Sequence, residues 1–272
     1  MATLEVRGLY KTFFPGTPDE VRALRGLDFS IEQGSFVVVI GTNGSGKSTT
    51  LNAVAGTFLA DAGTITLAGQ NITRWPEHRR ARFIGRVFQD PLAGTSPTLS
   101  IAENFALAAQ RGLRRTLGLA VSRRKIEEFR EYVRPLGMRL EDRLDNPIGS
   151  LSGGQRQALT LLMATFRKPE LLLLDEHTAA LDPRSAEQVI RLTDDIVRSQ
   201  KLTTMMVTHS MTHAASLGDR LVMVHQGRLI LDVSGAEKRR LRSHDLLEKF
   251  EDLRRSDQLD ESAARLIREN YV

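Results

Sequence analysis

The sequence predicts an α/β fold in which buried parallel strands alternate with helices. Two runs, 36–40 and 171–174, consist only of apolar residues, as expected of strands buried on both faces. The first run leads directly into a glycine-rich loop and a helical segment at 47–55. With 272 residues, 41% of them hydrophobic, the chain can bury one large core or two coupled subdomains.

The N-terminal part is expected to be rich in β-structure. Short apolar stretches alternate with polar turns up to residue 40, as at 27–31. We expect a second pair of strands at 64–67 and 85–88. From about 92 to 147 the pattern becomes helical, with Ser100 or Ser122 as N-caps and glycines at 112 and 137 as stops.

The α/β alternation resumes after residue 155. We expect the following elements in order: a strand at 171–175, a helix at 183–198, and strands at 203–208, 221–225 and 228–233, the last two joined at Gly227. Residues 236–272 carry nine basic and nine acidic side chains with leucines at helical spacing. This composition predicts a short amphipathic helical tail.

Composition limits the function classes. The longest apolar runs are far shorter than the roughly 20 residues that cross a bilayer, so any membrane role requires another chain. The chain has no cysteine, which fits a reducing compartment. Its net charge is +5, and residues 111–143 carry ten basic against five acidic side chains. A helical face near anionic phospholipid explains this stretch better than nucleic acid, because groove-reading elements are missing.

Residues 41–49 form a phosphate-binding loop of the P-loop pattern between the apolar strand and its helix. They are Gly41, Thr42, Asn43, Gly44, Ser45, Gly46, Lys47, Ser48 and Thr49. Glycines let backbone N–H groups wrap a phosphate, and the helix dipole adds favourable potential. Lys47 is expected to reach the β- and γ-phosphates of a nucleotide, and Ser48 to ligate Mg²⁺.

Two carboxylates end the second buried strand. Adjacent residues of a strand point to opposite faces, so Asp175 can hold Mg²⁺ while the Glu176 side chain reaches a different position in the site. We expect Asp175 to bind the metal directly or through water. Glu176 is then the candidate general base that activates the attacking water.

A second anion site is expected at residues 151–155, which read LSGGQ. Ser152, Gly153, Gly154 and Gln155 offer a hydroxyl, a side-chain amide and open backbone N–H groups at the start of an apolar helical run. This pentapeptide, about a hundred residues after the phosphate loop, resembles the signature of the ATP-binding cassette (ABC) family. In that family the signature of one subunit closes over ATP held by the phosphate loop of another.

The resemblance implies roles for three further positions. Gln89 is similar to the glutamine that senses Mg²⁺ and the attacking water. His209, which comes 33 residues after Glu176, is similar to the switch histidine at the γ-phosphate. Asp182 matches the loop that crosses the dimer interface. An aromatic residue upstream of the phosphate loop stacks on adenine in this family, and Phe13 is our choice here, with Phe14 as the alternative.

The resemblance also implies the organisation of the chain. Residues 1–233 would form the nucleotide-binding domain, with a RecA-like core and antiparallel β subdomain at 1–90 and 156–233, and a helical subdomain at 91–155. Residues 234–272 would form the tail. The residue after the catalytic Glu is commonly Pro in importer ATPases, whereas here it is His177, which we expect on a surface loop rather than at the phosphate or metal.

The function implied is hydrolysis of ATP with Mg²⁺ by a homodimer on the cytoplasmic face of the membrane. It would power a separate transmembrane permease, with import of an amino-acid-like molecule through a substrate-binding protein and no nucleic-acid partner. Residues 90–104 are expected to dock the permease. The phrase at 175–183 resembles cassettes of amino-acid and tryptophan-type uptake systems. The alternative is a soluble ABC ATPase that drives an assembly such as an iron–sulfur scaffold.

Overall fold

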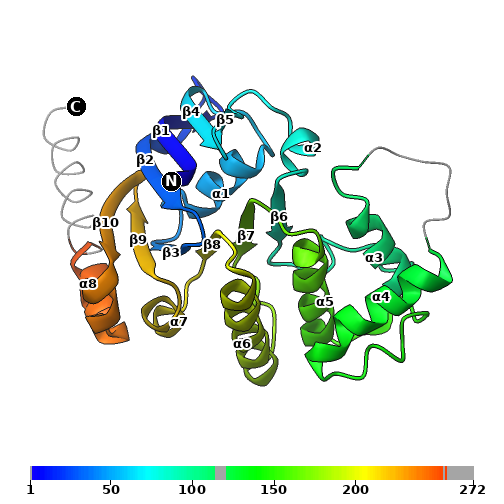
Figure 1. Ribbon diagram of the computed structural model, residues 1–272. Helices are drawn as coiled ribbons and strands as arrows, with labels where there is room; N and C mark the ends of the chain where they lie inside the picture. Colours follow the sequence, from blue (N-terminus) through cyan, green and yellow to red (C-terminus); the bar gives the residue numbers. More distant parts are fainter. Residues whose placement is uncertain (1, 114–120, 254, 256–272) are drawn as a thin grey trace, which may run out of the picture.

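The computed structural model describes the chain except for residues 1, 114–120, 254 and 256–272 (Figure 1). Its larger sheet has six strands in the order β10-β9-β3-β8-β7-β6. The pairs from β9 to β6 are parallel, and β10 is antiparallel to β9. The bounds of these strands are β3 Phe36–Gly41, β6 Ile84–Val87, β7 Leu171–Asp175, β8 Thr204–Val207, β9 Arg220–His225 and β10 Arg228–Ser234.

The second sheet is antiparallel, in the order β2-β1-β4-β5. Its strands are β1 Ala2–Phe13, β2 Val21–Glu32, β4 Ala62–Leu67 and β5 Gln70–Asn71. The expected pairing of 64–67 with 85–88 is therefore wrong. A tight turn at Ala68-Gly69, both at positive φ, pairs β4 with β5, while β6 joins the parallel sheet beside β7.

Eight labelled α-helices and a further helical stretch at 243–253 connect and cover the strands in the described residues. The labelled helices are α1 Lys47–Ala55, α2 Glu77–Arg80, α3 Ile101–Ala109, α4 Arg123–Val133, α5 Gly153–Phe166, α6 Pro183–Gln200, α7 Met211–Ser216 and α8 Gly235–Arg240, with short 3₁₀ turns η1 Arg134–Leu136 and η2 Ile148–Ser150. Ser100 and Ser122 cap α3 and α4 as predicted, each accepting a hydrogen bond from the backbone three residues on.

Alternating side chains of the parallel strands divide the core between the two faces of the large sheet. Val38, Leu172 and Leu174 belong to a cluster shared with α3 to α6, whereas Leu171 and Leu173 belong to one shared with α1 and the small sheet. The ribbons show the same layers, with α5, α6 and α7 on one face and α1 and the small sheet on the other (Figure 1).

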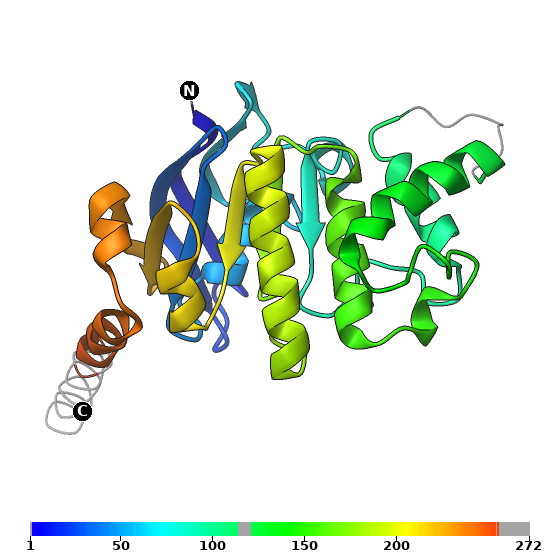
Figure 2. The same cartoon turned by 60° about the horizontal axis from the view of Figure 1, so that its bottom comes forward.

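The ends of the molecule are helical. At one end Phe105, Phe129, Tyr132 and Phe166 form edge-on and tilted ring contacts that join α3, α4 and α5. At the other end α8 and the helical residues 243–253 lie against β9 and β10 (Figure 2). The rest of the predicted tail lies outside the described residues, and the domain boundaries at 90, 155 and 233 stay predictions. No described helix is long and apolar enough to cross a membrane.

Candidate nucleotide and metal site

The strand order brings four predicted segments to one edge of the large sheet. The phosphate loop follows β3, His209 follows β8, Asp175 and Glu176 end β7, and Gln89 follows β6. These four strands are neighbours and run parallel, so their carboxyl ends lie side by side. Ligands of open α/β sheets bind at this edge.

Two glycines of the phosphate loop are required because neighbouring backbone atoms lie too close for a Cβ. A Cβ at Gly41 would lie 2.1 Å from the Val224 carbonyl oxygen. Gly46 has φ +103, and a Cβ there would lie 2.6 Å from the Ala23 carbonyl oxygen. Gly44 instead faces open space, with no atom within 4 Å of a Cβ. The loop is thus packed against the protein at Gly41 and Gly46 and open at Gly44, where a phosphate would lie.

Lys47 is buried at the start of α1 and folds over this loop. Its Nζ donates to the carbonyl oxygens of Gly41 and Thr42, both at 2.9 Å. Burial lowers the pKa of Lys47, and the charges of Glu176 and Asp175 partly oppose that shift. The buried Ser45 hydroxyl has no hydrogen-bond partner among the described residues. A buried cation and an unpaired hydroxyl beside an open cradle fit the phosphates of a nucleotide.

The two carboxylates at the end of β7 differ in their surroundings. Burial raises the pKa of Asp175, partly offset by Arg86, whose Nη2 lies 3.4 Å from Asp175 Oδ2. Glu176 has φ +45, a strained conformation for a residue with a Cβ, and its N–H donates to the Val207 carbonyl oxygen at 3.0 Å. Its Oε1 lies 2.6 Å from His209 Nε2, so the structure brings the candidate base and switch histidine into contact.

The predicted metal ligands are all oxygen donors, which suits Mg²⁺. Ser48 is exposed in the first turn of α1, and Asp175 is partly buried at the end of β7. Gln89 is exposed just after β6, where Gln157 Nε2 donates to the Phe88 carbonyl oxygen at 3.0 Å and fixes the preceding residue. The residues present therefore fit Mg²⁺ held jointly with nucleotide phosphates.

The LSGGQ segment begins α5, as predicted. Ser152 caps the helix by accepting from the Gln155 N–H, and the Gln155 side chain accepts from the Ser152 N–H. A Cβ at Gly154 would lie 2.8 Å from Ser185 Cβ, so this glycine allows α5 to approach α6. Since α5 packs beside β6, three strands from β3, the structure does not bring the signature to the phosphate loop of its own chain.

Asp182 caps α6, accepting from the Ser185 N–H at 3.0 Å. Hydrogen bonds from Ser185 lower the pKa of Asp182. The preceding Leu181 lies over the start of α5, where a Cβ at Gly153 would come within 3.1 Å of it. The loop around Asp182 therefore sits beside the signature segment.

The two aromatic candidates differ in burial. The Phe13 ring packs edge-on against Phe58, with centroids 5.3 Å apart. Phe14 is 66% exposed at φ +51. Phe13 is therefore partly buried and Phe14 exposed, and neither belongs to the buried core. The role of Phe13 in adenine stacking stays a prediction.

His177 is not on a surface loop, so that expectation is wrong. It is 2% exposed, and its Nε2 lies 2.9 Å from the Thr193 hydroxyl on α6. Burial lowers the pKa of His177 to about 4, with a smaller contribution from His213 on α7. The chain turns at Glu176, which has φ +45, and the side chain of His177 therefore points inward, near Thr193 of α6 and His213 of α7.

Sequence reasoning also missed Arg86, which contacts the Asp175 carboxylate. The available signal was a single cation inside the short apolar strand Ile84–Val87, a position where a charge is costly unless it is paired.

The burial of His177 predicts a pH-dependent stability. In the unfolded chain its pKa returns to about 6.5, so below that pH the unfolded state takes up a proton that the folded state does not. This part of the free energy of unfolding is complete above pH 6.5 and is lost between pH 6.5 and about 4, by up to about 3 kcal/mol. Urea unfolding at pH 7 and 5 should show a smaller loss for His177→Gln, which does not titrate. Equal losses in the two proteins would contradict this account.

Comparison with known proteins shows the family of the chain. The family model for ABC transporters matches residues 24–179. A tyrosine transport ATP-binding protein of Clostridioides difficile is 43% identical over 248 residues, which cover 91% of this chain and 98% of that protein. An aliphatic sulfonates import ATP-binding protein of Albidiferax ferrireducens is 36% identical over 77% of this chain and 68% of its own.

The fold is also that of solved cassettes. A dimeric ATP-binding cassette in a post-hydrolysis state with ADP and Pi aligns with a TM-score of 0.72 at 24% identity, covering 85% of this chain and 98% of the other. The motifs, their placement along one sheet edge and the matched family agree. The chain belongs to the ABC transporter family and is an ATP-binding subunit that hydrolyses ATP with Mg²⁺.

Proposed function

We propose that this chain powers the uptake of an amino-acid-like solute through a separate permease. The observation that carries the proposal is its 43% identity to a tyrosine transport ATP-binding protein along nearly the full length of both chains. The chain would act as a homodimer bound peripherally at the cytoplasmic face of the membrane. A substrate-binding protein on the other side would deliver the solute.

The site geometry supports a role for each residue. ATP with Mg²⁺ supplies the phosphoryl group that water attacks. Glu176 accepts the proton of that water, and His209, 2.6 Å away, holds the carboxylate in place beside the γ-phosphate position. Lys47 and the phosphate-loop N–H groups stabilise the phosphate charge. Asp175, Ser48 and Gln89 would hold Mg²⁺.

The homodimer follows from the separation of the two anion sites. The phosphate loop follows β3 and the signature starts α5, beyond β6. A second copy that places its signature over the first copy's phosphate loop completes both sites at once. Asp182 and its loop, next to the signature segment, would then lie at the interface.

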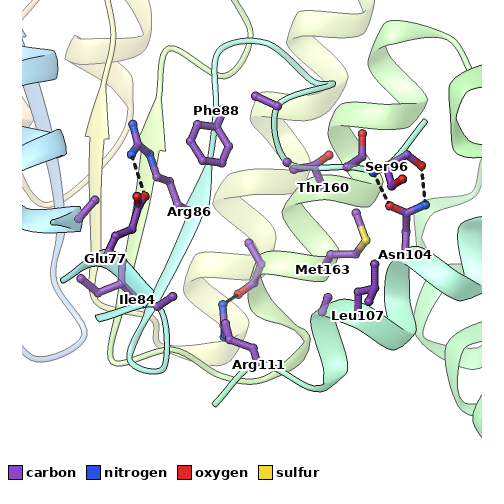
Figure 3. Close-up of a pocket in the computed structure, with 17 residues that line it drawn as sticks. Glu77, Ile84, Arg86, Phe88, Ser96, Asn104, Leu107, Arg111, Thr160 and Met163 are labelled. Atoms are coloured by element: carbon purple, nitrogen blue, oxygen red, sulfur yellow. Dashed lines mark hydrogen bonds and ion pairs between the residues drawn. The ribbon is translucent and has the colours of Figure 1, made fainter. Parts of the chain in front are cut away.

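A groove beside the catalytic edge supports the docking of a permease helix. Its volume is about 650 Å³. Figure 3 shows Phe88, Ser96, Asn104 and Leu107 around it, contributed by the end of β6, the following loop and α3. Leu107 is 57% exposed, whereas Ile101 and Phe105 are fully buried and fill the helical core instead. We therefore extend the proposed docking face at 90–104 to Leu107 and leave Ile101 out of it.

The role of Glu176 predicts the effect of Glu176→Gln. The amide keeps the shape but cannot accept a proton, so ATP turnover should fall by about 10²- to 10⁴-fold while ATP still binds. Gel filtration with MgATP should show a dimer that persists. The control is Glu170→Gln, which changes an exposed acid directly before the same strand. An ATPase rate equal to that of the wild type in Glu176→Gln would show that Glu176 is not the general base.

Adenine stacking predicts unequal effects at the two N-terminal aromatics. Stacking of a base is worth about 1 to 3 kcal/mol, so Phe13→Ala should weaken ATP binding by roughly 5- to 150-fold. Phe14→Ala should weaken it less. Titration calorimetry measures both affinities. If neither substitution changes the affinity, the base is held elsewhere.

The groove predicts which surface change uncouples the subunit. Leu107→Glu should leave the isolated protein folded and its basal ATPase intact, because the side chain is exposed and remote from the phosphate loop. It should abolish co-purification with the permease and stimulation of ATPase by the transported amino acid. The control is Leu247→Glu, 49% exposed on the C-terminal helix and outside the groove. If no membrane protein co-purifies with the wild type, the result favours the alternative of a soluble ATPase that drives an assembly.

A further inference from the structure

Arg86 is a mostly buried cation within β6, between the buried residues Gly85 and Val87. Its side chain is 13% exposed, and its Nε has no partner among the described residues. A buried guanidinium costs free energy unless other groups compensate for the lost water. The groups that compensate here come from two different places.

One set of partners belongs to the catalytic edge. Nη2 donates to the Asn52 side-chain oxygen on α1 at 2.6 Å and to Asp175 Oδ2 at 3.4 Å. Asp175 is the proposed ligand of Mg²⁺. The guanidinium therefore holds a positive charge at the carboxylate that the metal would use, and its bond to that carboxylate is the longer of the two.

The other set of partners includes two residues that line the groove, Glu77 and Phe88. Nη1 donates to the Thr57 hydroxyl at 3.1 Å and lies 4.0 Å from Glu77 Oε1. The guanidinium carbon lies 4.4 Å from the centroid of the Phe88 ring, next to Gln89 in the chain. Figure 3 shows Arg86, Glu77 and Phe88 together on the groove wall. A single side chain thus spans from the metal ligand to the docking groove.

We propose that Arg86 is a positioning residue that bonds Asp175 as well as the groove wall while the groove is empty, and gives up Asp175 in favour of Glu77 and Phe88 when a permease helix fills the groove. Asp175 is then released for Mg²⁺. The groove half of this inference rests on the proposed function, whereas the competition with Mg²⁺ does not. One cation shared between two sets of partners is the physical basis of such a switch, because an occupant of the groove can strengthen one set of contacts at the expense of the other.

The competition is tested by the metal dependence of ATP binding. Calorimetry in a Glu176→Gln background gives the ATP dissociation constant in EDTA and in Mg²⁺, and their ratio reports how much the metal strengthens binding. Arg86→Met removes a charge next to Asp175, so the ratio should rise by about 10-fold. Arg86→Lys keeps the charge and should keep the wild-type ratio.

The matched control is Arg82→Met, an exposed arginine four residues earlier whose side chain bonds the Gly112 carbonyl oxygen and not a carboxylate. Its ratio should equal that of the wild type. A purely structural role of Arg86 would weaken binding equally with and without Mg²⁺. An unchanged ratio in Arg86→Met, with folding verified by thermal melting, overturns the proposal.

The link to the groove is tested in the permease complex. Glu77→Gln and Arg86→Lys should keep the wild-type metal ratio but reduce substrate stimulation of the ATPase by several-fold. Full stimulation in both variants overturns the link. If no permease exists, stimulation is lost for the wild type as well while the metal ratio still responds to Arg86→Met. That result separates failure of the transport proposal from failure of this one.

Discussion

The parallel alignment of β3, β8, β7 and β6 is the constraint on which the site depends. Each strand contributes one catalytic segment at its carboxyl end, and the segments come from residues far apart in the chain. Because the register between neighbouring strands is fixed by backbone hydrogen bonds, Asp175 lies level with Val207 on β8. The 2.6 Å contact between Glu176 and His209 follows from this alignment more than from any attraction between the two side chains.

Buried charge gives this edge its chemistry. Lys47 and Asp175 are both largely removed from water, and burial shifts the pKa of each toward its neutral form. Each opposes the shift of the other, and Arg86 adds a second cation at Asp175. Phosphates would bring negative charge to the buried Lys47, and Mg²⁺ would bring positive charge to the partly buried Asp175.

Sequence patterns predicted what is decided locally. The capped starts of α3, α4 and α5 depend on side chains three residues apart, and the phosphate loop and the buried strands are each recognised from a run of consecutive residues. The failures involve contacts between distant segments. The strand β4 was predicted to pair with the wrong strand. His177 was predicted on the surface, although it is buried and contacts the Thr193 hydroxyl on α6. Arg86 was overlooked because its partners lie on α1 and β7. Periodicity carries no information on such contacts.

The burial of His177 bears on how the catalytic pair is held. Glu176 adopts a strained left-handed backbone, which persists only where its surroundings determine it. Its N–H is fixed by β8, and the next side chain is anchored on Thr193 of α6. His213, which lies near His177, belongs to α7, and α7 begins two residues after His209. The same packed region therefore supports the loop of Glu176 and the helix that follows His209. A displacement of α7 would change the distance between the base and the histidine, so packing behind the site contributes to the catalytic geometry in front of it.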